Sequence, residues 1–138
     1  MKMFASLLVS FSLFFNLPYC SAKETENIRL GVWVTVFSTE GVLLSKENVD
    51  RMLDTSASCG IDDIYMQVYR ADKAYYNSSI TDASPYKNIA SGAGCDTFSY
   101  LIKEAKKRDI SVHAWINLLS IAQNEKANIV KTFGKSVL

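Results

Sequence analysis

The sequence has little histidine and cysteine and no clear excess of charge of either sign. One histidine and three cysteines occur in 138 residues, and they do not form the spacing of a zinc site. A phosphate-binding loop and a dinucleotide fingerprint are both absent, and no serine lies in a nucleophile-elbow pattern. We therefore predict no metal site and no cofactor.

The charge balance also argues against nucleic acid as a partner. The chain has 15 Lys and Arg residues against 14 Asp and Glu residues. Without residues 1–22, the remaining 116 residues carry 14 basic and 14 acidic side chains. A nucleic-acid-binding domain would show a basic excess, so we expect no nucleic-acid partner.

The first 22 residues have the three parts of a secretory signal peptide. Lys2 supplies the positive start, residues 4–15 form an apolar run broken only by serines, and small residues precede Lys23. This run is too short for a comfortable membrane span. We therefore predict a signal peptide at 1–22, a domain at 23–138, a secreted or periplasmic location and no membrane span after cleavage. The alternative is a lipoprotein anchored at Cys20, although Tyr19 replaces the small residue normally found before such a cysteine.

Three segments have the alternating side chains of β-strands, namely Ile28–Phe37, Ile61–Arg70 and Val112–Asn117. Successive side chains of a strand project to opposite faces. In each segment one face is aliphatic. The other face is polar and aromatic, and it carries Trp33, Thr35, Phe37, Tyr65, Gln67, Tyr69, His113, Trp115 and Asn117.

Helical patterns separate these strands. Ser45 is the predicted N-cap of a helix that ends at Gly60, and Asp96 is the predicted N-cap of a second helix. A further helix is predicted from Asn124 to Phe133. Residues 71–95 form a long connection without clear periodicity. The resulting order β-α-β-α-β, with a possible last helix, predicts an α/β fold with a parallel sheet.

Several of these segments resemble the glycosyl hydrolase-like 10 family. Leu30–Thr35 resembles its first strand, Tyr65–Arg70 with Ala74–Ser78 its second strand and loop, and Tyr100–Arg108 with Val112–Asn117 its second helix and third strand. The three matches occur in order and at suitable spacing over most of residues 28–120. The resemblance implies a TIM-type (β/α)8 barrel that acts on, or binds, envelope or extracellular carbohydrate.

The chain departs from that family in two respects. It has Lys106 and Asp109 where the family often has a histidine and a glycine. It also holds only about three βα units, whereas a whole barrel takes about 250 residues. We therefore expect an incomplete barrel, with the remainder in a longer chain or a separate polypeptide. The alternative is a small open α/β fold, which is less favoured because three parallel strands leave unprotected edges.

The barrel interpretation also predicts two free cysteines. Cys59 would end the first helix at the bottom of the barrel, and Cys95 would precede the second helix at the top. A strand of five or so residues separates those levels by about 16 Å, whereas the Cα atoms of a disulfide lie within about 7 Å.

The sequence does not identify catalytic residues. Glycoside hydrolysis usually needs two carboxyl groups, and barrel active sites form at the carboxyl ends of the strands. Only Glu40 and Asp72 lie near such positions, and neither belongs to a paired motif. Asp62 and Asp63 begin the second strand, so we interpret them as structural. We therefore predict no hydrolysis by this polypeptide alone.

The polar face instead offers a candidate carbohydrate-binding surface. We predict that the substrate-binding residues are Gln67, Arg70, His113, Trp115 and Asn117. Two alternatives stay open: Gln67 as a hydrogen-bonded core amide, and His113 as a satisfied core histidine. Tyr75 and Tyr76 would line the cleft or anchor the long loop. The predicted function is the first part of a secreted glycoside hydrolase, and the alternative is a non-catalytic carbohydrate-binding or envelope-associated protein.

Overall fold

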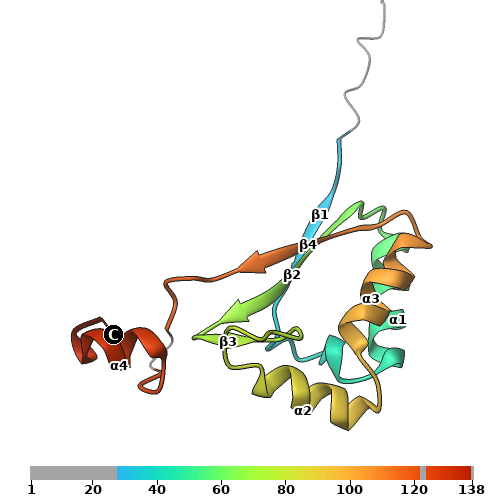
Figure 1. Ribbon diagram of the computed structural model, residues 1–138. Helices are drawn as coiled ribbons and strands as arrows, with labels where there is room; N and C mark the ends of the chain where they lie inside the picture. The colour runs from blue at the N-terminus through green and yellow to red at the C-terminus, as the bar shows by residue number, and fades with distance from the viewer. Residues whose placement is uncertain (1–27, 122–123, 138) are drawn as a thin grey trace, which may run out of the picture.

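A computed structural model describes residues 28–121 and 124–137 of the chain (Figure 1). The predicted leader at residues 1–22, including Cys20, lies outside the described residues. In chain order the elements are β1 (Gly31–Val34), the 3-10 helix η1 (Val42–Leu44), α1 (Lys46–Ser58), β2 (Asp63–Arg70), β3 (Lys73–Ala74), α2 (Ser84–Ala93), α3 (Thr97–Lys106), β4 (Ser111–Ile116), α4 (Asn128–Phe133) and the 3-10 helix η2 (Lys135–Val137).

The sheet is built around β2, which pairs with each of the other strands in the described part of the chain. β1 and β4 both run parallel to β2, and the short β3 runs antiparallel to its last two residues. The α/β class is therefore confirmed. The three predicted strands lie side by side and parallel, as expected, but β3 makes the complete sheet mixed.

The two predicted helices between the parallel strands, α1 and α3, begin where the sequence predicts, and α1 also ends there. The Ser45 Oγ accepts a hydrogen bond from the Asn48 backbone N–H at 3.2 Å, which caps α1. The Asp96 carboxylate accepts one from the Ser99 N–H at 3.0 Å, which caps α3. Gly60 follows α1 with a φ of 69°, a left-handed conformation that glycine adopts without steric cost.

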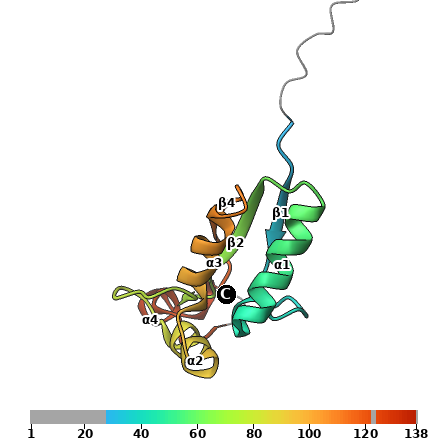
Figure 2. The same ribbon diagram turned by 90° about the vertical axis from the view of Figure 1, so that its right-hand side faces the viewer.

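The core lies between the sheet and these helices. α1 and α3 lie side by side over one face of the sheet (Figure 2). Their inward side chains pack against the aliphatic side chains of β2, and six members of this core are completely buried: Val49, Leu53, Ile64, Met66, Leu101 and Ala105. The aliphatic face predicted for β2 is therefore the face that the helices cover.

The outer strand β4 is less covered than its alternating pattern predicts. Of its aliphatic side chains, Val112 packs against the core, whereas Ala114 is exposed and Ile116 is 51% exposed. The helix that follows, α4, lies beyond the carboxyl end of β2 and does not cover this face (Figure 1). The aliphatic face of β4 is therefore only partly used within the described residues.

The predicted long connection at residues 71–95 contains regular structure that the sequence analysis missed. It forms β3 and then α2. Two signals mark α2: Pro85 lies in its first turn, and Gly94 ends it with a φ of 67°. The helix predicted from Asn124 is shorter than expected, because α4 begins at Asn128, although Gly134 follows its end.

Both remaining thiols are free, as the barrel geometry predicts. Cys59 is exposed and Cys95 is half-buried. They lie at the end of α1 and before α3, respectively.

Candidate functional site

The polar and aromatic side chains of the three parallel strands form one continuous surface. In the strand register Trp33, Tyr65 and His113 lie opposite one another. The Trp33 and Tyr65 rings stack with centroids 4.6 Å apart, and the Tyr65 and His113 rings stack at 4.9 Å. Residues opposite one another project to the same face. Tyr65 alternates with Ile64 and Met66, which pack against the helices, so the three rings lie on the face turned away from the helices.

At the amino end of this surface, charge is compensated within the protein. The Asp63 carboxylate accepts hydrogen bonds from Nε and Nη2 of Arg29, each at 2.8 Å, and lies 2.8 Å from Nε2 of His113. The hydrogen bonds from Arg29 and then from His113 hold the pKa of Asp63 well below its usual range. Asp62 accepts a bond from the Leu30 N–H at 2.8 Å. Both aspartates therefore make the structural contacts expected of them.

Gln67 lies in the middle of the surface and is only 2% exposed. Its Oε1 accepts hydrogen bonds from the Thr35 Oγ at 2.9 Å and from the Val36 N–H at 3.4 Å. This geometry matches the alternative interpretation of Gln67 as a hydrogen-bonded core amide. Trp115 lies opposite Gln67 on β4 and is half-buried.

A β-bulge interrupts the alternation of side chains near the end of β2. Gln67 pairs with Trp115, but Tyr69 pairs with Ile116, so Val68 is an extra residue on β2. Trp115 and Ile116 are consecutive in β4 and project to opposite faces. Tyr69 therefore projects to the face opposite Gln67, which corrects its predicted place beside Gln67.

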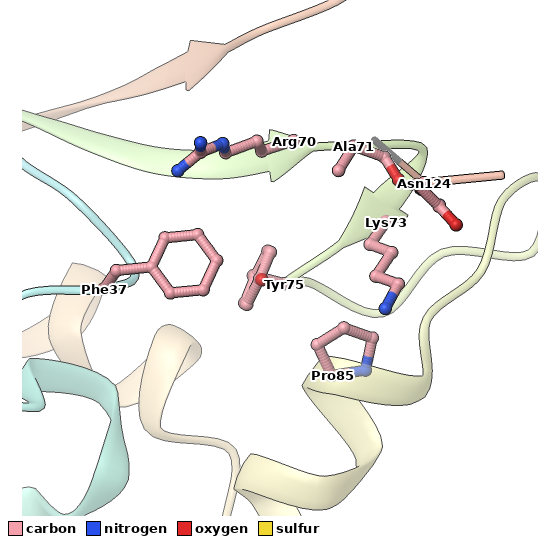
Figure 3. Close-up of a pocket in the computed structure, with 7 residues that line it drawn as sticks. All are labelled: Phe37, Arg70, Ala71, Lys73, Tyr75, Pro85 and Asn124. Carbon is pink, nitrogen blue, oxygen red and sulfur yellow. Dashed lines mark hydrogen bonds between the residues drawn. The ribbon is translucent and has the colours of Figure 1, made fainter. Parts of the chain in front are cut away.

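After the bulge, Arg70 projects from the face that also carries Gln67. It reaches a cleft at the carboxyl end of the strands (Figure 3). The cleft has a volume of about 490 Å³ and lies between β2, β3 and the start of α2. Its lining residues are Phe37, Arg70, Ala71, Lys73, Tyr75, Pro85 and Asn124.

Two aromatic rings form part of the cleft lining. The Arg70 guanidinium carbon lies 5.0 Å from the centroid of the Phe37 ring, which is a cation–π arrangement. The Tyr75 ring meets Phe37 edge-on, with centroids 6.3 Å apart. Burial raises the pKa of Tyr75, and the nearby positive charge of Arg70 opposes that shift. Phe37 is 63% exposed and offers a flat apolar face to a ligand.

A tight turn between β2 and β3 sets the position of the two cleft cations. Ala71 and Asp72 occupy it with φ values of 56° and 59°, which are costly for residues that have a Cβ. The Ala71 N–H donates to the Ser120 carbonyl at 2.9 Å, and its carbonyl accepts from Nδ2 of Asn124 at 2.6 Å. These bonds hold the turn in its strained conformation.

The carboxylates considered as catalytic candidates are not brought together in the cleft. Asp72 accepts hydrogen bonds from the Tyr69 hydroxyl at 2.9 Å and the Asn128 N–H at 2.7 Å, so it ties α4 to the turn. Glu40 lines a separate groove beside β1 and α1. The described lining of the cleft contains no acidic side chain.

The five predicted binding residues are therefore divided along the surface. Only Arg70 lines the cleft. Gln67 and Trp115 lie in the middle, and His113 lies near the amino end of the strands. Asn117 follows β4, where its backbone N–H donates to the Tyr69 carbonyl at 3.0 Å.

Four residues of the cleft lining were not predicted from the sequence: Ala71, Lys73, Pro85 and Asn124. The signal for Lys73 was the tight turn, since Arg70 and Lys73 face each other across it. The proline at the start of α2 was the signal for Pro85. Asn124 is distant in the sequence, and no local pattern indicates its contact.

Residues 28–121 and 124–137 lack two further features. This part of the chain contains no cluster of three or more His, Cys, Asp or Glu side chains that would hold a metal ion. Its helices include none that is long and apolar enough to cross a membrane.

Comparisons with known proteins agree on one family. The sequence pattern of the glycosyl hydrolase-like 10 family matches residues 27–138. The glycosyl hydrolase YngK of Bacillus subtilis (strain 168) is 23% identical over 119 residues, which cover 79% of this chain and 23% of that protein. The glycosyl hydrolase DigH of Escherichia coli (strain K12) is 21% identical over 140 residues, which cover 87% of this chain and 31% of that protein. The chain thus spans less than a third of the length of either relative. No solved structure matches it.

Proposed function

The chain belongs to the glycosyl hydrolase-like 10 family, and from this membership we propose that it is the amino-terminal part of a glycoside hydrolase. The names of the two relatives, both glycosyl hydrolases, support the reaction class. The proposed substrate is an extracellular or cell-envelope carbohydrate.

In this proposal the three parallel strands are the beginning of a TIM-type (β/α)8 barrel. Their order in the sheet follows their order in the chain, as consecutive barrel strands do. Among the described residues, β1 and β4 each pair only with β2, so each leaves an edge to which a further strand can bind. The partial coverage of the relatives supports the same conclusion. The partner that completes the barrel is its remainder, in a longer chain or a separate polypeptide.

The proposed location is outside the cytoplasm. The pattern of residues 1–22 supports a cleaved signal peptide and a secreted or periplasmic domain. Lipidation at Cys20 is the alternative. In either case the protein would meet carbohydrate outside the cell membrane.

The single observation that carries the carbohydrate proposal is the cleft lined by Phe37, Arg70 and Tyr75. It lies at the carboxyl ends of the strands, the end at which barrel enzymes bind substrate. Its aromatic rings suit the apolar face of a sugar ring. Its charged and amide groups supply hydrogen bonds for hydroxyl groups.

We also propose that the chain alone does not hydrolyse glycans. Its described cleft lining lacks the two carboxylates that the reaction needs, and Asp72 is engaged in structural hydrogen bonds. The same observation favours a second candidate, a non-catalytic carbohydrate-binding protein on the same scaffold.

Sequencing the genomic DNA downstream of the Leu138 codon distinguishes the two candidates. For a hydrolase we expect further βα units in frame, with Asp or Glu at the ends of later strands. Units without such acids would favour the binding protein. An assay of reducing-sugar release from extracellular polysaccharides by the purified chain tests its inactivity, and measurable turnover would contradict it.

A further inference from the structure

We propose that the cleft selects sugars that carry a carboxylate, and that Arg70 is the residue that recognises this group. The inference rests on the proposed carbohydrate function and adds the chemical class of the ligand. It follows from the charges in the cleft, the orientation of Arg70 and the rigidity of the turn that follows it.

The charged side chains of the cleft lining are both cations. Arg70 and Lys73 are directly opposite in the antiparallel pairing of β2 and β3, so they project to the same face. Neither forms an ion pair within the part of the chain that the structure describes. Lys73 pairs with Asp82 in an isolated β-bridge, and its positive charge helps to lower the pKa of that carboxyl, after the hydrogen bonds from Ser84. Arg70 is therefore the less compensated of the two cations.

The position of Arg70 suits a carboxylate beside a sugar ring. Its guanidinium lies over Phe37, and stacking on one face leaves the N–H groups at its edge available. A guanidinium binds a carboxylate through two parallel hydrogen bonds, which are stronger than bonds between neutral groups. The exposed part of the Phe37 ring, together with Tyr75, can contact the apolar face of the same sugar.

The hydrogen-bonding capacity of the lining agrees with an acceptor-rich ligand. Arginine and lysine side chains only donate hydrogen bonds, and an ionised carboxylate only accepts them. The Oδ1 of Asn124, an acceptor at this end, already accepts a bond from the Lys126 N–H at 3.2 Å. The lining therefore offers more donors than acceptors, which matches an acidic sugar better than a neutral one.

The cleft is also held in place before a ligand arrives. The β2 bulge turns Arg70 toward Phe37, and the Ser120 and Asn124 contacts to Ala71 fix the turn that follows. Such preorganisation lowers the entropy lost on binding. Arg70 thus recognises the ligand from a fixed backbone.

The test compares one sugar with and without its charge. The full chain is titrated by calorimetry with a galacturonic acid oligosaccharide and with the methyl ester of the same oligosaccharide. We expect the acid to bind about tenfold more tightly than the ester. This ratio corresponds to the free energy of a charge-assisted hydrogen bond between Arg70 and the sugar carboxylate. Raising the salt concentration should reduce this ratio, because salt screens an ion pair that solvent reaches.

Two variants assign the effect to a residue. Arg70→Gln should weaken binding of the acid more than binding of the ester, so that the two oligosaccharides bind with similar affinity. The matched control is Lys103→Gln, which removes an exposed charge from α3 and should change neither affinity. Circular dichroism reports whether each variant is folded, and the salt dependence of the unmodified chain tests the proposal independently of any variant.

The outcomes separate this inference from the proposed function. If acid and ester bind equally, or if Arg70→Gln weakens both alike, carboxylate selection is wrong while carbohydrate binding stands. If neither oligosaccharide binds, both the selection and the carbohydrate function of this chain are overturned.

Discussion

The two ends of the same sheet surface treat charge in opposite ways. At the amino end, Arg29, Asp63 and His113 satisfy one another within the protein. At the carboxyl end, Arg70 and Lys73 face a cleft whose described lining has no carboxylate. Compensated charges hold strands together, whereas charges without a partner are available to a ligand. The difference identifies one end as architecture and the other as the candidate binding site.

The largest expected effect is a loss of stability in the core, which supports both ends of the surface. Such a loss would remove the difference between the two ends. Leu53 of α1 is completely buried, and Leu53→Ala should lower the free energy of unfolding by about 2–5 kcal/mol through lost contacts and a cavity. Urea denaturation measures this change. The control Leu44→Ala alters a side chain that is 59% exposed and should cost much less. Equal losses in the two variants would contradict the assigned core.

The next prediction concerns the compensated end. The folded pKa of Asp63 is depressed, chiefly by Arg29 and then by His113. Its contribution to stability is therefore present above the unfolded pKa of about 3.9 and is lost as the pH falls through the lower folded value. Asp63→Asn should lower the melting temperature at neutral pH and reduce its further fall in acid. Thermal melts across the acid range measure both effects.

Asp109→Asn is the matched control for that prediction. Asp109 is exposed and has a φ of 56°, a conformation that asparagine tolerates. This variant should keep the acid dependence of the unmodified chain. An equal loss of acid dependence in both variants would show that Asp63 is not its source.

At the carboxyl end of the surface, a smaller change in the free energy of unfolding is expected, and its sign is opposite. Ala71 has a φ of 56°, so Ala71→Gly should raise the free energy of unfolding by about 1 kcal/mol by removing the steric cost of its Cβ. Ala74→Gly in β3, at a residue without positive φ, should instead destabilise the fold by about 0.5–1 kcal/mol. Chemical denaturation compares the two. A loss of stability in Ala71→Gly would contradict the strain assigned to the turn.

The smallest effect sharpens the comparison by using one residue type at both ends. Arg70→Gln should lower the free energy of unfolding by only about 0.5 kcal/mol, because Arg70 has no ion-pair partner among the described residues and loses only its exposed cation–π contact with Phe37. Arg29→Gln should lower the melting temperature clearly, because it leaves Asp63 with His113 alone. If the two variants melt together, the assigned difference between the ends is wrong.

Local chemistry explains the parts of the fold that could be predicted. The N-caps Ser45 and Asp96 act through backbone N–H groups three residues away, and Gly60 ends α1 through its own backbone conformation. Strand alternation correctly placed Trp33, Tyr65 and His113 on one face. Each of these features depends on neighbours in sequence or on a period of two residues.

The parts that could not be predicted depend on contacts distant in the sequence. The bulge at Val68 is defined by the register between β2 and β4, so alternation alone assigned Tyr69 to the wrong face. The turn at Ala71 and Asp72 lacks the glycine or asparagine that usually marks such a hairpin, since Ser120 and Asn124 hold it instead. The cleft was therefore only partly visible from the sequence.

The extra residue in β2 also matters for how this protein is compared with its relatives. Removing Val68 would restore strict alternation and leave Arg70 on the cleft face and Tyr69 on the opposite face, because Tyr69 already pairs with Ile116. A strand that aligns with β2 residue for residue but lacks the bulge would instead place the position of Tyr69 on the cleft face and that of Arg70 on the opposite face. An alignment that closes a one-residue gap here would equate side chains that point to opposite sides of the sheet.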